Sequence, residues 1–544
     1  MNKSIVWTRA LFALAAGFFP AIATAQAPAP AAILNAASNV PMALPGGAIA
    51  QGAIFVLYGK NMGGASLSQA SALPLPAAGL NGTTVTVTAG STTLKVPLLY
   101  TLSTQIAGVL PSTTPIGNAT LNVTFGGATG TLAFKVVKSS FGISTVDQSG
   151  AGAAVVTFGD ISLVTQSKPA KVGDTLIIWG TGLGATSVDD GIVPPQVDLN
   201  TGAKVFVAGK EAPVVYAGRS AGPGLDQINF KVPEGTDGCR ASLVVQIGSL
   251  VSNFTNIAIA PAGEPCTEFG TPGIFGHVRA DYISLLPDLL SRESTKIGII
   301  DLEQTSKNDK VGFSIPGATS TQAYFLNVSK AQLPSLLSLY TPPVSGGSCT
   351  VTFTPAGKAA TVPTEAGIDA GATVTLTPPS GPAITMAAQK PGIYSQSVSK
   401  IPPGAWSAAN AGGAAVPAFK IDMALPQAVG WLNAGDSSSI DRTKGLVIKW
   451  GGGDALNNFV EVTGTVAYGT APNNGTATLD CVSVQLPLTL TIPPTVFAAL
   501  PTTANLPIAM AVNSSDPAQV LQVPGTDVTL GVSHQWLTFD GVMK

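Results

Sequence analysis

Short runs in which apolar residues alternate with threonine, serine or asparagine recur along most of the chain. Residues 85–88 and 121–125 are examples, and the runs are bounded by glycine, proline or asparagine. In residues 446–450 the same period puts Leu446, Ile448 and Trp450 on one side. A period of two gives a strand one apolar face and one polar face, as in a half-buried antiparallel sheet. The pattern predicts a mainly β protein.

The chain also repeats itself. Residues 52–59 align with residues 173–180, and Gln105-Ile106 aligns with Gln227-Ile228, at offsets of 121 and 122 positions. Each copy is a unit of roughly 110–120 residues, the size of one immunoglobulin-like sandwich. We therefore expect two tandem immunoglobulin-like repeats, at residues 26–143 and 144–262.

The repeated segments resemble a known family. Residues 33–38 and 52–59, followed by Asn61-Met62, look like the opening of IPT/TIG-type immunoglobulin-like repeats. The closer likeness is to an uncharacterised domain at the C-termini of exported proteins of Solibacter-type soil bacteria. Its matching pieces in the second copy are residues 173–183, 213–218 and 227–233 and Cys239. The first copy departs from the pattern at Ala107 and has no cysteine. The resemblance covers residues 31–262, implies the sandwich fold and brings no catalytic residues with it.

The sequence pattern changes in residues 263–345. Apolar residues recur there at helical spacing, namely Tyr282, Leu285, Leu286, Leu289 and Leu290. Pro287 is expected to split this helix, and a second short candidate at residues 329–339 contains Pro334. We expect a mixed segment with short helices that cap a neighbouring sheet. From residue 346 to 544 the strand patterns return and predict a larger C-terminal β-sandwich.

The N-terminal residues predict export. Lys3 and Arg9 precede an apolar run over residues 10–22, and Ala23-Thr24-Ala25 has small residues at the positions that a signal peptidase reads. We expect a signal peptide at residues 1–25, an uncleaved anchor being the alternative. The mature chain has no apolar stretch long enough to span a membrane. The protein is expected to be secreted, either extracellular or periplasmic.

Cysteine usage agrees with an oxidising compartment. The chain has four cysteines, Cys239, Cys266, Cys349 and Cys481, and none forms a C-x-x-C pair. Two disulfides can connect them in three ways. We favour Cys239–Cys266 and Cys349–Cys481, which join neighbours along the chain, and four buried free thiols are the alternative.

Composition excludes several classes of function. Only 10% of the residues are charged, against about 25% in an ordinary soluble domain. The formal net charge of −2 gives no electrostatic footprint for nucleic acid. The chain has only two histidines, His277 and His534, so a histidine-based metal site or catalytic triad is not expected. We expect no cofactor and no metal, since Asp189, Asp190 and Asp198 lack a calcium-loop spacing.

The remaining candidate chemistry is that of carbohydrates. Asp301 and Glu303 would share one face of a strand, a suitable arrangement for glycoside hydrolysis, although a solvated strand face is the simpler interpretation. Among the tryptophans, Trp179 and Trp450 lie in strand patterns and are expected in the core. Trp406 and Trp431 lie in loop-like sequence and are the candidate ligand contacts.

The sequence thus predicts an exported, non-enzymatic multidomain β protein that acts in binding, adhesion or as a spacer at the cell surface or outside the cell. Its partner would be an extracellular polysaccharide or another surface protein. The alternative is a polysaccharide-binding protein or hydrolase subunit whose site lies in the C-terminal half, near Trp431 or Asp301.

Overall fold

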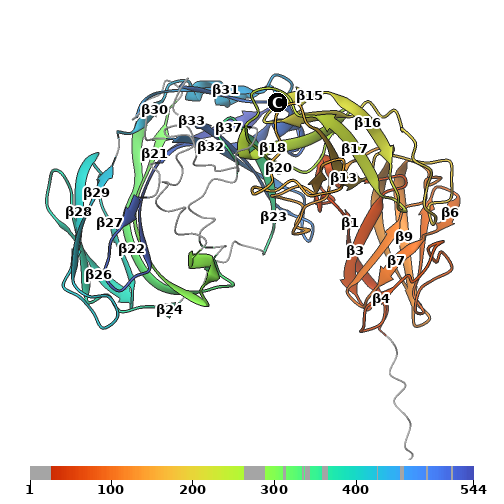
Figure 1. Cartoon of the computed structure of the whole chain (residues 1–544), viewed down its shortest axis with the longest axis horizontal. Helices are drawn as coiled ribbons and strands as arrows, with labels where there is room; N and C mark the ends of the chain where they lie inside the picture. The colour runs from red at the N-terminus through yellow and green to blue at the C-terminus, as the bar shows by residue number, and fades with distance from the viewer. Residues whose placement is uncertain are drawn as a thin grey trace, which may run out of the picture.

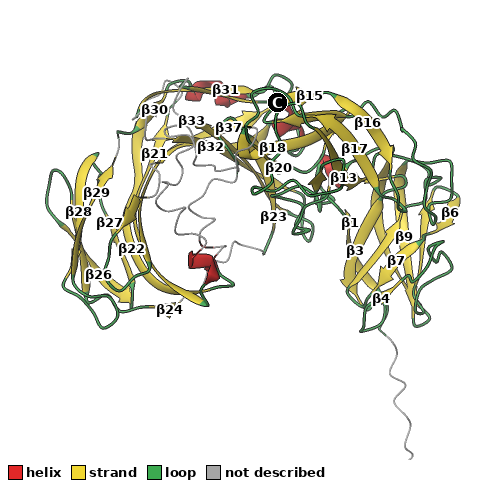
Figure 2. Ribbon diagram, in the orientation of Figure 1, coloured by secondary structure: helices red, strands yellow, loops and turns green. Residues whose placement is uncertain are grey.

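Strands dominate the chain, and the prediction of a mainly β protein with tandem sandwiches is confirmed. The computed structural model describes residues 26–261, 288–309, 314–333, 336, 344–357, 366–425, 427–453, 459–484, 488–515 and 519–544. Three β units form an arch, with the first repeat at one foot and strands β26, β28 and β29 at the other (Figure 1). Figure 2 shows how little helix the described residues contain. The expected signal peptide lies outside the described residues.

The first repeat is a sandwich of two sheets. One sheet has the order β1 (Ala29–Asn35), β3 (Ile54–Lys60), β8 (Gln105–Val109), β7 (Leu98–Thr101), β4 (Ser68–Gln69). The other has the order β2 (Ile49–Ala50), β10 (Ala128–Val137), β9 (Gly117–Phe125), β5 (Thr84–Ala89), β6 (Thr92–Lys95). Both sheets contribute to one buried core, for example through Phe55 and Leu121.

The second repeat is built in the same way. One sheet has the order β11 (Gly142–Ile143), β13 (Thr175–Thr181), β17 (Asp226–Lys231), β16 (Val214–Arg219), with β12 (Val156–Thr157) paired to β13. The other has the order β15 (Lys210–Ala212), β14 (Lys204–Val207), β18 (Gly238–Ile247), β19 (Leu250–Val251), with β20 (Thr255–Ile259) paired to β18. The duplication is visible in the strand register. Tyr58 pairs with Gln105 in the first copy, and Trp179 pairs with Gln227 in the second.

The C-terminal unit contains a large sheet, to which the described residues contribute 14 strands. Its order is β23 (Cys349–Pro355), β33 (Gly475–Val484), β32 (Phe459–Tyr468), β35 (Leu506–Ser515), β37 (Val528–Met543), β21 (Ser294–Asn308), β22 (Ser314–Ser329), β27 (Ile393–Ser397), β26 (Ile384–Lys390), β25 (Thr373–Thr377), β28 (Gly404–Asn410), β29 (Phe419–Leu425). β24 (Ala366–Gly367) pairs with β22, and β36 (Gln519–Leu521) pairs with β37. A separate small sheet consists of β30 (Val429–Trp431), β31 (Leu446–Gly452) and β34 (Thr489–Ile492).

Strands β21 and β22 lie within the stretch expected to be a mixed segment with short helices. They form a long antiparallel hairpin near the middle of the large sheet, and β21 is also parallel to β37. Residues 294–329 therefore belong structurally with the strands that follow residue 346. The described helical parts are short: 288–291, the separate residues 333 and 336, η1 (Pro45–Gly47), η2 (Ala434–Ser439) and α3 (Pro494–Ala498). Most of the helical candidate at 282–290, and His277, lie outside the described residues.

The outer face of the large sheet is buried in two cores. Near β21 and β22 the far end of the sheet curls back, so that Phe325 and Leu302 pack with Trp406 of β28. Near β32 and β37 the small sheet covers the large one, so that Val462 and Phe539 pack with the core that contains Trp431 of β30. The two tryptophans fill these cores.

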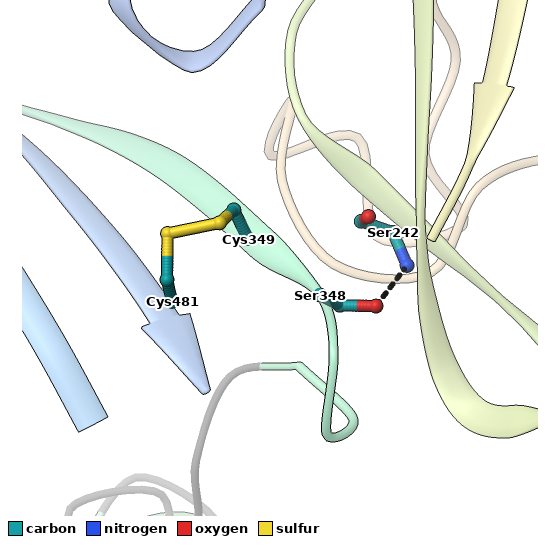
Figure 3. Close-up of a disulfide and its surroundings, with 4 residues drawn as sticks. All are labelled: Ser242, Ser348, Cys349 and Cys481. Atoms are coloured by element: carbon teal, nitrogen blue, oxygen red, sulfur yellow. Dashed lines mark hydrogen bonds between the residues drawn. A yellow bond between two sulfur atoms is a disulfide. The ribbon is translucent and has the colours of Figure 1, made fainter. Parts of the chain in front are cut away.

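One buried cluster joins all three units. It contains Val40 and Leu44 of the first repeat and Val244 and Phe254 of the second, together with the outer core of the C-terminal unit. Hydrogen bonds add to this joint: the Ser242 N–H of β18 donates to Ser348 Oγ at 3.2 Å (Figure 3). The shared core holds the arch in one shape.

The two repeats are joined by Arg219, which a buried ion pair holds in place within the second repeat. Arg219 and Asp226 of the second repeat are 1% and 0% exposed and bind each other. Arg219 Nη2 also donates to the carbonyl oxygens of Gly52, in the first repeat, and Gly184, at 3.1 and 2.5 Å. A Cβ atom on Gly52 would collide with Arg219, so glycine is required there. The contact fixes the first repeat against the second.

The prediction that Cys349 pairs with Cys481 is confirmed. The disulfide joins β23 to β33, where the two residues lie directly opposite each other (Figure 3). Cys239 is also disulfide-bonded. Its expected partner, Cys266, lies outside the described residues.

Candidate functional site

The inner face of the large sheet changes from apolar to acidic along strand β21. On β21, Ile297 and Ile299 are apolar and pack with Leu289 of the short helix at 288–291. This helix lies inside the curve of the sheet (Figure 2), which identifies the face as the concave one. Two and four residues after Ile299, the same face carries Asp301 and Glu303. The prediction that these two acids share a strand face is therefore confirmed.

Polar side chains lie level with Asp301 and Glu303 on the inner face of six adjacent strands. Directly paired residues share a face of a sheet. In the strand registers, Asp301 of β21 pairs with Gln322 of β22, and Glu303 of β21 pairs with His534 of β37. Trp536 of β37 pairs with Asn513 of β35, which in turn pairs with Glu461 of β32. Thr463, on the same face as Glu461, pairs with Asp480 of β33. We call this set, with Tyr324 next to Gln322, the inner-face row; its members are Tyr324, Gln322, Asp301, Glu303, His534, Trp536, Asn513, Glu461 and Asp480.

Contacts within the row link neighbouring strands. Asn513 Nδ2 donates a hydrogen bond to Glu461 Oε2 at 3.1 Å and lies 3.5 Å from His534 Nδ1. The rings of His534 and Trp536 stack with their centroids 6.3 Å apart. On β22, the Tyr324 hydroxyl donates to Gln322 Oε1. These contacts connect side chains of the row to one another.

Burial and like charges change the protonation of the row. Burial, with the charge of Glu303, raises the pKa of Asp301 to about 7. Burial, followed by the charge and hydrogen bond of Glu461, raises the pKa of Asp480 well above its ordinary value. Burial lowers the pKa of His534, against the opposing charges of Glu461 and Glu303. Near neutral pH, Asp301 is therefore divided between its two protonation states.

Two carboxyl oxygens of the row have no hydrogen-bond partner. Asp301 Oδ1 and Asp480 Oδ1 are buried and accept no hydrogen bond. Asp301 and Glu303, two residues apart on one strand face, have Cα atoms about 6.6–6.8 Å apart. No three acidic, histidine or cysteine side chains of the described residues converge as metal ligands.

The loop positions predicted for Trp406 and Trp431 are wrong. Both side chains are 1% exposed and lie in strands. Trp406 Nε1 donates to the Pro402 carbonyl at 2.9 Å. A ring buried to this extent offers no free face on which a sugar could stack. Trp450 is buried in a strand as expected, while Trp179 is in a strand but only half-buried.

Of the three acids considered for calcium, Asp190 serves the joint between the repeats. It accepts hydrogen bonds from the Ser112 N–H and hydroxyl of the first repeat, both at 2.6 Å. Asp189 and Asp198 instead bind backbone N–H groups in their own turns. The three acids do not converge on one point.

Sequence reasoning missed most of the row. Trp536, Glu461, Asp480 and Asn513 come from strands far apart in the chain, so no local motif joins them. A signal was present in single strands: Glu461 interrupts an otherwise apolar and hydroxyl-bearing strand at residues 459–468. Only the pairing of strands shows that these interruptions line up.

Comparisons with known proteins leave the chain without a family. No protein-family description and no curated protein matches it. Among solved structures, a Bacteroides thetaiotaomicron protein of unknown function is 12% identical, with a TM-score of 0.15; the match covers 41% of this chain and 46% of that one. This chain therefore spans less than half of that protein. Such values carry no argument about function.

Two further structures match over a greater length. SGBP-B from a complex xyloglucan utilization locus of Bacteroides uniformis is 10% identical over 95% of this chain and 99% of that one, with a TM-score of 0.16. Invasin, a bacterial integrin-binding protein, is 11% identical over 94% and 78%, with a TM-score of 0.12. These similarities are equally weak. Among the described residues, no helix is both long and apolar enough to cross a membrane.

Proposed function

We propose that this protein is an exported, non-enzymatic binding protein whose ligand is a polysaccharide held on the inner-face row. The observation that carries the proposal is the row itself. Carboxyl, amide and hydroxyl groups on six adjacent strands offer hydrogen bonds to sugar hydroxyls, and the half-buried rings of Trp536 and Tyr324 lie beside them. Aromatic rings combined with a few polar groups are the usual lining of a ligand site.

The two repeats have a supporting role in this proposal. The shared core and the Arg219–Asp226 contact favour a stiff arm that holds the C-terminal unit away from the point of attachment. Adhesion and spacing at the cell surface would follow from such an arm. The resemblance to IPT/TIG-type repeats and the expected signal peptide belong to the same proposal, and the Cys349–Cys481 disulfide supports an oxidising compartment.

A hydrolase is the second candidate, favoured by one observation. A carboxyl group whose pKa is raised to about 7, next to a second carboxyl on the same strand face, has the character of a general acid. Both candidates place the ligand on the row, so a single set of variants tests them together.

The test is binding of the mature chain to a polysaccharide panel, followed by titration calorimetry with the best ligand. We expect Trp536→Ala to weaken binding by about tenfold or more, a loss of about 1.4 kcal/mol. Thr131→Ala, on the exposed surface of the first repeat, is the matched control and should bind as the unmodified chain does. Absence of any glycan ligand, or equal binding by Trp536→Ala, would contradict the proposal. Glycan turnover abolished by Asp301→Asn would favour the hydrolase.

A further inference from the structure

Among the residues that the structure describes, the carboxyl groups of the row form no ion pair with lysine or arginine. The ion pairs of the described residues lie elsewhere, for example between Lys204 and Glu211 and between Lys307 and Asp540. None of them involves Asp301, Glu303, Glu461 or Asp480. In a chain with almost equal numbers of acids and bases, these four carboxyl groups lie on one face of the sheet with no ion pair to another described residue.

Asp301 adds an observation that does not depend on counting charges. Its Oδ1 atom is fully buried and accepts no hydrogen bond, although it lies among polar neighbours. A buried acceptor left without a donor destabilises a protein, and native structures rarely contain one without a reason. A ligand that brings a donor to this position would remove the penalty.

The shape of the row suits an extended ligand. Six adjacent strands at a spacing of about 4.8 Å place β22 and β33 roughly 24 Å apart. The two acidic pairs, Asp301 with Glu303 and Glu461 with Asp480, lie on either side of β37 and β35. Trp536 lies between them, and a cation near an aromatic ring is further stabilised.

We propose that the ligand of the row is a positively charged polysaccharide, a chain of amino sugars whose ammonium groups meet the two acidic pairs. This proposal rests on the proposed function. The ammonium groups would donate to the unpartnered acceptors, while the amides of Gln322 and Asn513 would meet the hydroxyl groups of the sugar.

The protonation of Asp301 couples binding to pH. The titratable groups that face it are Glu303 on its own strand, Tyr324 on β22 and His534 on β37, with Glu461 beyond. Because these neighbours supply no cation, burial holds the pKa of Asp301 near 7. A bound cation favours the ionised carboxylate, so affinity for a ligand of constant charge is expected to rise from pH 5.5 to pH 8.

The test compares two hexasaccharides with the same β-1,4 backbone. One is the glucosamine hexamer in its protonated form, whose ammonium groups can donate hydrogen bonds, and the other is the neutral N-acetylated hexamer. A fully trimethylated glucosamine hexamer, whose charge does not change with pH but whose nitrogens donate no hydrogen bond, serves for the pH series. We expect the charged hexamer to bind the mature chain about tenfold more tightly at low salt, with the difference shrinking as salt is added. Asp301→Asn with Glu303→Gln should remove most of the difference and the pH dependence. Glu211→Gln, which removes one exposed acid outside the row, should leave both unchanged.

Each other outcome has a definite meaning. Equal or tighter binding of the neutral hexamer overturns the charge preference and leaves the proposed function intact. If neither hexamer nor any panel glycan binds, the proposed function fails as well. Tighter binding of a lysine hexapeptide than of the charged sugar overturns the polysaccharide class. Thermal melting of the double variant verifies that it is folded.

Discussion

The carboxyl group of Asp301 is buried beside Glu303 without a bonded partner, and this makes stability depend on pH. Its pKa is raised to about 7 in the native chain, against 3.8 ordinarily. Between these values the native state binds more protons than the unfolded state, so stability falls as pH rises. Asp480 contributes in the same direction, because its pKa is also raised.

Asp301→Asn is predicted to reduce this dependence. The variant should match the unmodified chain at pH 4 and exceed it at pH 8 by roughly 2–4 kcal/mol, because the cost of ionising a buried carboxyl is removed. Urea denaturation at pH 4, 6 and 8, followed through the unfolding of the C-terminal unit, measures the difference in free energy of unfolding. A gap that is widest at pH 4 would contradict the assignment.

Gly52 is a second residue whose identity follows from its surroundings. Its φ is +71°, and a Cβ atom would collide with Arg219 and approach the Gly184 carbonyl. Gly52→Ala should lower the melting temperature of the repeats by several degrees, a destabilisation of roughly 1–3 kcal/mol. Gly90→Ala is the matched control, because Gly90 also has a positive φ, +59°, but open space around it. Equal effects of both variants would mean that the joint tolerates the added atom.

At the scale of elements, the local sequence pattern predicts those features that depend on a single strand. The alternation predicted the shared face of Asp301 and Glu303, and the duplication predicted two sandwiches, whose strand registers prove to match. It failed for Trp406 and Trp431. Residues 402–404, Pro-Pro-Gly, precede Trp406 and residues 433–435, Asn-Ala-Gly, follow Trp431, so the local sequence of both is loop-like. Pairing with neighbouring strands nevertheless holds both residues extended. The row could not be predicted, because it depends on which distant strands become neighbours.

The Cys349–Cys481 disulfide is expected to stabilise the edge of the large sheet. It ties β23 to β33 across 132 residues of sequence. Replacing both cysteines by serine should destabilise the C-terminal unit by about 2–5 kcal/mol, because the unfolded chain loses a long closed loop. Thermal melting with and without reductant measures this. The double variant should be insensitive to reductant at this transition, and a lower melting temperature on reduction would show that another bond is responsible.

At the scale of the whole molecule, the joints between the units matter more than any single sandwich. One core cluster contains side chains of all three units, and a buried ion pair fixes the first repeat to the second. Joints of this kind favour motion of the arch as one body. A flexible string of domains would lack such a shared core.

Asp226→Ala is predicted to loosen the arch. It leaves Arg219 buried without its partner, at a cost of about 3–5 kcal/mol to the contact between the repeats. Small-angle X-ray scattering should then show a larger radius of gyration and a broader distance distribution, with each sandwich still folded. Lys204→Ala, which breaks an exposed pair in the same repeat, should leave the scattering curve unchanged.

The position of β37 has a consequence for how the chain reaches this state. The strand lies between β35 and β21, and it is parallel to β21, more than two hundred residues earlier in the chain. Pairings between such distant segments form slowly, because a long loop must close before any contact rewards it. The large sheet therefore stays in two halves until residues 528–543 have emerged, however early the two repeats fold. Biogenesis then depends on keeping the exposed edges of β35 and β21 apart from other chains during that interval.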